Sequence, residues 1–192
     1  MKTAIVTDSN SEISQSEANR LGVFVLPMPV IIDGHAYYEG LDLLSDQFFL
    51  ALTQHRAVST SQPSPGDVTA LWDRVLSEYD ELVYIPMSSS LSSSCATAKI
   101  LAKDYAGKVF VVDNHRISVT QKASVLDALA LREEGVGAWE IQQELEDSAF
   151  DSIIYIGVET LEYLRKGGRV TARTAAISTV LQIKPLLKVE GE

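Results

Sequence analysis

Short apolar runs alternate with segments of helical spacing along most of this chain, and this alternation restricts the possible folds more than any other feature. Runs typical of buried strands include "TAIVTDS", "ELVYIPM" and "KVFVVD". Helical patterns such as "GDVTALWDRVLSEYD" and "ATAKILAKDYAG" stand between them. Strands connected through helices pair in parallel, with helices on both faces of the sheet. The sequence therefore predicts an α/β fold built on a mainly parallel sheet.

The second apolar run, "VFVLPMPVIID", contains Pro27 and Pro29. Proline has no N–H to give to a sheet, so we expect one strand here that lies at an edge or has an irregular end. Asp33-Gly34 follows this run and is typical of a tight turn.

Composition and charge exclude several classes of partner. The chain has 192 residues, of which 46% are hydrophobic, and a formal net charge of −10. No block of Lys and Arg is longer than two residues, which argues against a nucleic-acid partner. Cys95 is the single cysteine, so we expect a core side chain, no intrachain disulfide and a reducing compartment. No apolar run reaches the roughly 18 residues of a membrane span, and we expect a cytoplasmic protein.

The character of the sequence changes near Ser152. The remaining stretch contains one strand pattern, a helix ending at Gly167-Gly168, and a final strand, "PLLKV", that runs into the turn-like "EGE". No returning strand follows, which leaves that final strand with an open edge. We expect residues 1–150 to form an N-terminal α/β domain and residues 151–192 to form the first part of a second α/β domain that is cut short.

Hydroxyl-bearing residues cluster where strands end. Thr7-Asp8-Ser9 and the segment Ser88–Ser94 directly follow predicted strands, and Ser59–Gln62 precedes a helix. Ligands of parallel sheets bind beyond the carboxyl ends of the strands, so these segments are expected to lie near one another. Hydroxyls, together with the free N–H groups of a helix's first turn, suit a carboxylate or a phosphate without any lysine.

Other interpretations of these residues remain open. Ser92, Ser93 or Ser94 can simply cap the helix that follows. A serine hydrolase is the main alternative function, because His115 lies close to Asp113 and serines are plentiful, but no G-x-S-x-G motif is present. The glycine motifs that bind nucleotides are also missing. The acidic residues and histidines show no metal-ligand spacing, so we expect no metal.

The most basic stretch is Arg165-Lys166-Gly167-Gly168-Arg169. Glycines after a helix can leave backbone N–H groups free to bind an anion, which the nearby arginines would then cover. Alternatively, Arg165 and Lys166 complement the dipole of the preceding helix, and both roles are compatible.

Six motifs occur in a characteristic order: "VTDSNSEIS", "TSQPSPGD", "SSSLSSSCATA", "VVDNHRIS", "LEYLRKGGRV" and "LQIKPLLKVEGE". Together they resemble the DegV family of bacterial fatty-acid-binding proteins over essentially the whole chain. The resemblance implies two α/β domains that hold a long-chain fatty acid between them, with no other cofactor. It also implies a non-enzymatic role in phospholipid metabolism, in which the bound carboxylate is presented to a separate fatty acid kinase.

The same resemblance implies which residues form the site. Thr60 of "TSQPS" and Ser92 of "LSSS" would hydrogen-bond the carboxylate. The supporting shell around them would consist of Asp8, Ser9, Ser61, Ser88, Ser89 and Arg169, the last at the domain interface near the head group.

The sequence departs from the family pattern in three places. Leu91-Ser92-Ser93-Ser94 stands where the family usually has Leu-Ser-Gly-Thr, so a glycine is lost and a hydroxyl is kept. Val119-Thr120-Gln121 stands where glycines typically follow "NHRIS", which is expected to narrow or reshape the pocket. Family members also run considerably longer, and their additional portion carries a histidine that helps to hold the carboxylate. We expect either a naturally short chain or a fragment of a longer one.

Overall fold

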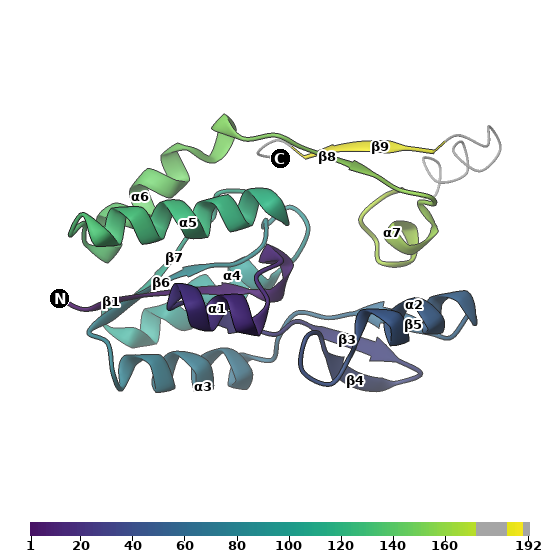
Figure 1. Cartoon of the computed structure of the whole chain (residues 1–192), viewed down its shortest axis with the longest axis horizontal. Coiled ribbons are helices and arrows are strands. Elements are labelled where there is room, and N and C mark those ends of the chain that lie inside the picture. Colours follow the sequence, from purple (N-terminus) through teal and green to yellow (C-terminus); the bar gives the residue numbers. More distant parts are fainter. Residues whose placement is uncertain (172–183, 190–192) are drawn as a thin grey trace.

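The computed structural model describes residues 1–171 and 184–189 (Figure 1). Its largest sheet contains β1 (Thr3–Asp8), β2 (Phe24–Leu26), β6 (Glu81–Ile85) and β7 (Val109–Val111). The strand order is β2-β1-β6-β7, and every neighbouring pair is parallel. The predicted α/β fold with a mainly parallel sheet is confirmed.

Helices cover both faces of this sheet, as predicted. One face packs against α1 (Gln15–Leu21), α5 (Val119–Glu133) and α6 (Ala138–Asp147). The other face packs against α3 (Pro65–Leu76) and α4 (Ser94–Leu101), and Figure 1 shows α5 and α6 on the opposite side of the sheet from α3. Three short 3-10 helices complete these connections: η1 (Ser9–Ser11), η2 (Ala102–Tyr105) and η3 (Ala149–Asp151).

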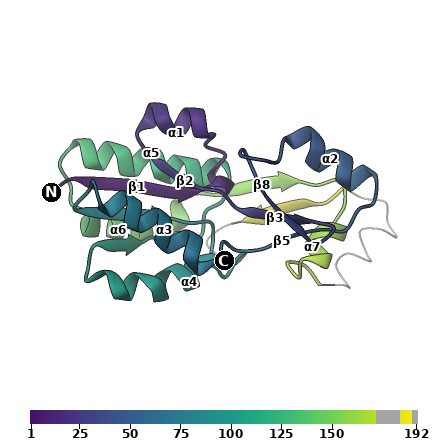
Figure 2. The same cartoon turned by 90° about the horizontal axis from the view of Figure 1, so that it is seen from below.

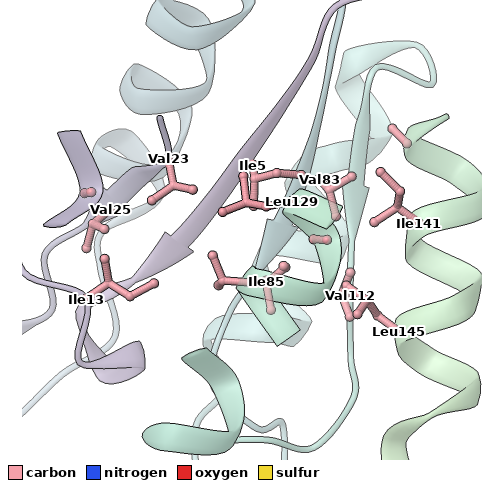
Figure 3. Packing of buried hydrophobic residues seen from close by; sticks show 14 residues of the cluster. Ile5, Ile13, Val23, Val25, Val83, Ile85, Val112, Leu129, Ile141 and Leu145 are labelled. Atoms are coloured by element: carbon pink, nitrogen blue, oxygen red, sulfur yellow. The ribbon is translucent and has the colours of Figure 1, made fainter. Parts of the chain in front are cut away.

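Strand β1 shows how the sequence produces two cores. Successive strand residues point to opposite faces, so Ile5 joins the core under α5 and α6 while Ala4 and Val6 join the core under α3 and α4. All six residues of β1 are buried because both faces are covered, which explains why Ala4, Ile5 and Val6 follow one another without a polar residue between them. Figure 3 shows Ile5 beside Val83 on the face that packs against α5 and α6.

Cys95 lies in the core under α3 and α4, as predicted. Its side chain is fully buried, and its thiol lies 3.8 Å from the carbonyl oxygen of Val112. Burial, which disfavours the thiolate, raises the pKa of Cys95 to about 12. The residue is therefore a packing residue of α4 and not a nucleophile.

A second, smaller sheet lies beyond one end of the large sheet (Figures 1 and 2). It consists of β3 (Pro29–Ile32), β4 (His35–Tyr38) and β5 (Val58–Thr60), in the order β4-β3-β5 with antiparallel pairing. Helix α2 (Ser45–Thr53) packs against it. This small sheet has a core of its own, formed by Val30, Ile32, Leu43 and Ala51. The predicted turn joins β3 to β4, with φ of 51° at Asp33 and 83° at Gly34.

The prediction of one strand over "VFVLPMPVIID" is wrong. The run forms two strands in two different sheets, because β2 pairs with β1 whereas β3 pairs with β4 and β5. Pro27 stands between them and has no N–H with which to continue a ladder. The chain therefore leaves the large sheet at this point and starts the small one.

The last described segments form a two-stranded antiparallel sheet. It consists of β8 (Ile154–Gly157) and β9 (Leu186–Val189), and α7 (Glu162–Lys166) follows β8. The predicted strand "PLLKV" thus has β8 as a partner on one side, while the predicted turn "EGE" (190–192) lies outside the described residues. The division into domains at residues 150 and 151 stays a prediction. Among the described residues, no helix combines the length and the apolar character needed to cross a membrane.

Candidate functional site

The candidate site lies at the carboxyl ends of β1 and β6, which are neighbours in the large sheet. The chain runs from β1 to β2 on one side and continues with β6 and β7 on the other. The strand order therefore reverses between β1 and β6. Such a reversal opens a crevice at the carboxyl ends of the strands, where open α/β sheets bind their ligands. A hydrogen bond of 2.9 Å from the backbone N–H of Met87 to Asp8 Oδ2 spans this crevice.

A cavity of about 380 Å³ adjoins the crevice. We call its apolar side the apolar wall, which consists of Met28, Pro29, Val30, Leu43, Leu44, Phe48 and Phe49. Its polar lining comes from Asn10, Glu39, Ser45, Thr60, Ser61, Ser92 and Arg169, and Met87 completes the lining. The volume falls within the range of about 300–1,000 Å³ that is usual for small-molecule sites. An apolar wall that faces a small group of hydroxyls suits an amphipathic ligand.

Four of the sequence-predicted site residues line this cavity: Thr60, Ser61, Ser92 and Arg169. Ser92 accepts a hydrogen bond of 3.2 Å from the backbone N–H of Ser94, which leaves its own hydroxyl hydrogen for a ligand. Thr60 is the last residue of β5 and is exposed. Among the described residues, no hydrogen bond engages its hydroxyl. Both hydroxyls are therefore available as donors at the same cavity.

Arg169 connects the segment after α7 to the serine segment. Its Nε donates to the carbonyl oxygen of Leu91 at 3.3 Å, and its Nη1 donates to the carbonyl oxygen of Gly167 at 3.0 Å. The guanidinium is exposed and also lines the cavity. It supplies the positive charge among the described lining residues, which also include the carboxylate of Glu39.

The cavity lining does not include Ser9, Ser88 or Ser89. The hydroxyl of Ser9 accepts a hydrogen bond of 3.0 Å from the backbone N–H of Met28, a residue of the apolar wall. Ser88 is buried, and its hydroxyl lies 2.7 Å from that of Ser90. These side chains shape the loops, whereas Thr60 and Ser92 face the cavity.

Ser89, His115 and Asp113 do not form a Ser-His-Asp triad. Ser89 Oγ lies 3.5 Å from His115 Nδ1, and Asp113 Oδ1 lies 3.9 Å from the same nitrogen. A triad requires the serine and the carboxylate on opposite ring nitrogens, so that one nitrogen receives the proton while the other is held. The described residues also contain no cluster of three or more His, Cys, Asp or Glu that could hold a metal ion.

Asp8 is fully buried and accepts hydrogen bonds from Asn10 and Met87, which both line the cavity. Asp8 Oδ1 accepts hydrogen bonds from the backbone N–H of Asn10 at 3.0 Å and from the Asn10 amide at 3.1 Å. It also accepts a bond of 3.0 Å from Gln121 Nε2, while Oδ2 accepts the Met87 N–H. Burial raises the pKa of the Asp8 carboxyl, and these donors act in the opposite direction.

Asp8→Asn is expected to remove a pH dependence of stability. Because the folded-state pKa of Asp8 lies above its ordinary value of 3.8, its stabilising contribution is fully present only below that value. The contribution falls as the pH rises from 3.8 through the folded-state pKa. The free energy of unfolding of wild type, minus that of the variant, should therefore decrease across this window. Urea unfolding of both proteins at a series of pH values measures it, and a constant difference would contradict the expectation.

The apolar wall and Gln121 are the parts of the site that the sequence did not reveal. The wall comes from the loop after β2, from β3, from the segment before α2 and from α2 itself, which lie in or around the unpredicted small sheet. Val119 is exposed and Gln121 is fully buried, and the cavity lining includes neither. Residues 119–121 therefore do not line the described cavity, and the expectation that they narrow or reshape the pocket stays a prediction.

Comparisons with known proteins agree with this fold. A family model described as an uncharacterised protein of the DegV family matches residues 2–192. A DegV domain-containing protein of Deinococcus radiodurans is 34% identical over 192 residues, which cover 100% of this chain and 68% of the relative.

Two solved structures show the same likeness in three dimensions. A Thermus thermophilus protein, described as a fatty acid-binding DegV family protein, matches with a TM-score of 0.88 at 33% identity, over 100% of this chain and 69% of that one. DegV of Bacillus subtilis, described as a fatty acid-binding protein, matches with a TM-score of 0.85 at 27% identity, over 99% and 68%. The chain spans about two thirds of the length of these relatives. This chain belongs to the DegV family.

Proposed function

We propose that this chain binds a long-chain fatty acid in the described cavity, with Thr60 and Ser92 donating hydrogen bonds to the carboxylate. The observation that carries the proposal is the pairing of an apolar wall with two available hydroxyls in one cavity of about 380 Å³. The fatty acid binding described for the relatives from Thermus thermophilus and Bacillus subtilis supports it.

The energetics of such a ligand suit this lining. Burial of one methylene contributes about 0.8 kcal/mol, so an acyl chain of about 15 methylenes contributes on the order of 12 kcal/mol before the costs of binding. The hydroxyls therefore do not need to supply the affinity. Their task is to make a desolvated carboxylate tolerable, because an unpaired one would be unfavourable or would take up a proton. Arg169 adds a positive charge at the same cavity.

We further propose that the protein is a cytoplasmic carrier and not an enzyme, and that it presents the carboxylate to a fatty acid kinase. Thr60 and Ser61 are exposed, which supports an accessible head-group end. Hydroxyl donors leave a carboxylate oxygen free of a tight ion pair, so it can accept a phosphoryl group from a partner. In this proposal Asp8, Ser9, Ser61, Ser88 and Ser89 support the loops around Thr60 and Ser92.

A charge on the apolar wall is expected to remove the bound lipid. Phe49 lines the cavity yet is 61% exposed, so Phe49→Glu should leave the fold intact. Loss of contact with about three methylenes would cost about 2.4 kcal/mol, which is roughly a 50-fold loss of affinity. Mass spectrometry of lipid extracted from the denatured protein should find a long-chain fatty acid in wild type and much less in the variant.

The neighbouring residue provides the matched control. Leu50 is 55% exposed on the same helix and does not line the cavity, so Leu50→Glu should retain the lipid. A wild-type protein that carries no fatty acid and binds none when it is added would refute the proposed function. Equal amounts of bound lipid in the Phe49 and Leu50 variants would show that the acyl chain does not bind along the apolar wall.

A further inference from the structure

Gln121 connects helix α5 to the strand ends at the candidate site. It lies in the first turns of α5, which packs on β1 and β6, and its side chain is fully buried. Its Nε2 lies within hydrogen-bond distance of three acceptors: Asp8 Oδ1 at 3.0 Å, Thr7 Oγ1 at 3.1 Å and the carbonyl oxygen of Ile85 at 3.1 Å. These acceptors belong to the carboxyl ends of β1 and β6, so one amide group holds together the two strands at which the order reverses.

Asp8 transmits this constraint to the cavity. Its two carboxylate oxygens accept the backbone N–H groups of Asn10 and Met87, and both of these residues line the cavity. The Asn10 amide also lies 3.1 Å from the sulfur of Met87. We call Asn10 and Met87 the pocket floor. A shift of the Asp8 carboxylate must therefore move both members of the pocket floor.

We propose that Gln121 is a positioning residue for anion binding: it fixes Asp8, and through Asp8 it fixes the pocket floor. This inference rests on the proposed function and adds a residue that does not touch the ligand. Asp8 and the carboxylate of a fatty acid would occupy neighbouring low-dielectric positions, where like charges disfavour each other. The N–H donors around Asp8 offset part of its negative charge. Removal of the Gln121 donor should therefore weaken the binding of a carboxylate ligand more than the binding of a neutral ligand of the same length.

The test is to replace Gln121 with methionine, which has a similar length and no N–H donor. Oleic acid and oleyl alcohol are titrated against a bound fluorescent fatty acid in wild type and variant. We expect Gln121→Met to weaken oleic acid at least about 10-fold and oleyl alcohol by less than about 3-fold, since only the acid carries a charge beside Asp8. If the methionine variant does not fold, Gln121→Asn, which keeps the amide but shortens its reach, gives the same comparison.

Gln142 supplies a matched control. It lies on α6, and its Nε2 donates to the carbonyl oxygen of Val111 on β7 at 2.7 Å, without a link to Asp8. Gln142→Met should leave the affinities for both ligands within about 3-fold of wild type. Equal weakening of acid and alcohol by Gln121→Met, or no weakening, overturns the positioning role while the proposed function stands. Failure of wild type to bind oleic acid overturns both.

Discussion

The double substitution Thr60→Val with Ser92→Ala is expected to weaken fatty acid binding by about 100-fold to 10,000-fold. Each hydroxyl donates to a charged group, and such hydrogen bonds contribute about 1.5–3 kcal/mol each. Loss of both gives about 3–6 kcal/mol, at 1.4 kcal/mol for each factor of ten. Both residues are at least partly exposed, so the fold should not change. Displacement of a bound fluorescent fatty acid by oleic acid measures the difference.

The neighbours of these residues make a close control. Ser59 and Ser93 are exposed hydroxyl residues, adjacent in sequence to Thr60 and Ser92, and they do not line the candidate cavity. The double variant Ser59→Ala with Ser93→Ala should bind oleic acid as wild type does. Similar losses in the two double variants would show that the hydroxyls of Thr60 and Ser92 have no special role in holding the carboxylate.

Replacing Trp72 with alanine is expected to lower the free energy of unfolding by about 3–5 kcal/mol. Trp72 is fully buried on α3, with ring centroids 5.6 Å from Tyr84 and 5.4 Å from Tyr105 in edge-on contacts. Its indole nitrogen has no hydrogen-bond partner among the described residues, so packing accounts for its contribution. Alanine would leave a cavity that the surrounding strands and helices cannot close. Urea unfolding followed by circular dichroism measures the loss.

The second tryptophan of the chain is the reference for this measurement. Trp139 lies on α6 and is 58% exposed, so Trp139→Ala should change the free energy of unfolding by less than about 0.5 kcal/mol. Comparable losses for both variants, or a loss below about 1 kcal/mol for Trp72→Ala, would contradict the packing described for the α3 face.

The large sheet could be predicted from the sequence because its strands are buried on both faces. All residues of β1 and β6 are buried, and the apolar runs Ala4–Val6 and Leu82–Ile85 at their centres have no polar interruption. The flanking helices bury one stripe each, which gives the 3.6-residue spacing of α3 and α5. Hydrophobic burial alone therefore specifies these elements and their alternation.

The small sheet could not be predicted in the same way. In β4, His35 and Ala36 are exposed, and in β5 only Val58 is apolar. Strands with so little buried surface leave almost no hydrophobic pattern in the sequence. The Asp33-Gly34 turn between β3 and β4 was the one sequence feature that indicated a connection here. That Thr60 and Ser92 line one cavity was therefore expected from the position of their segments near strand ends and from the family resemblance, and not from periodicity in β5.

The role of Gln121 could not be predicted from the sequence for a different reason. Its hydrogen bond to Asp8 joins residues that are 113 positions apart. A glutamine in the first turns of a helix gives no local sign of such a contact. Hydrogen bonds of this range become visible only once the strands and helices are placed in space.

The small sheet carries a further consequence, because its core is separate from the two cores of the large sheet. That core consists of four buried residues with Tyr37, Phe48 and Val58 packed against them, so we expect local opening of the small sheet to require less free energy than global unfolding. A ligand that contacts Thr60, at the end of β5, and Ser92, between β6 and α4, would connect the small sheet to the segment that follows the large sheet. Ligand binding is then expected to reduce the local opening of the small sheet, because opening would break the contact at Thr60.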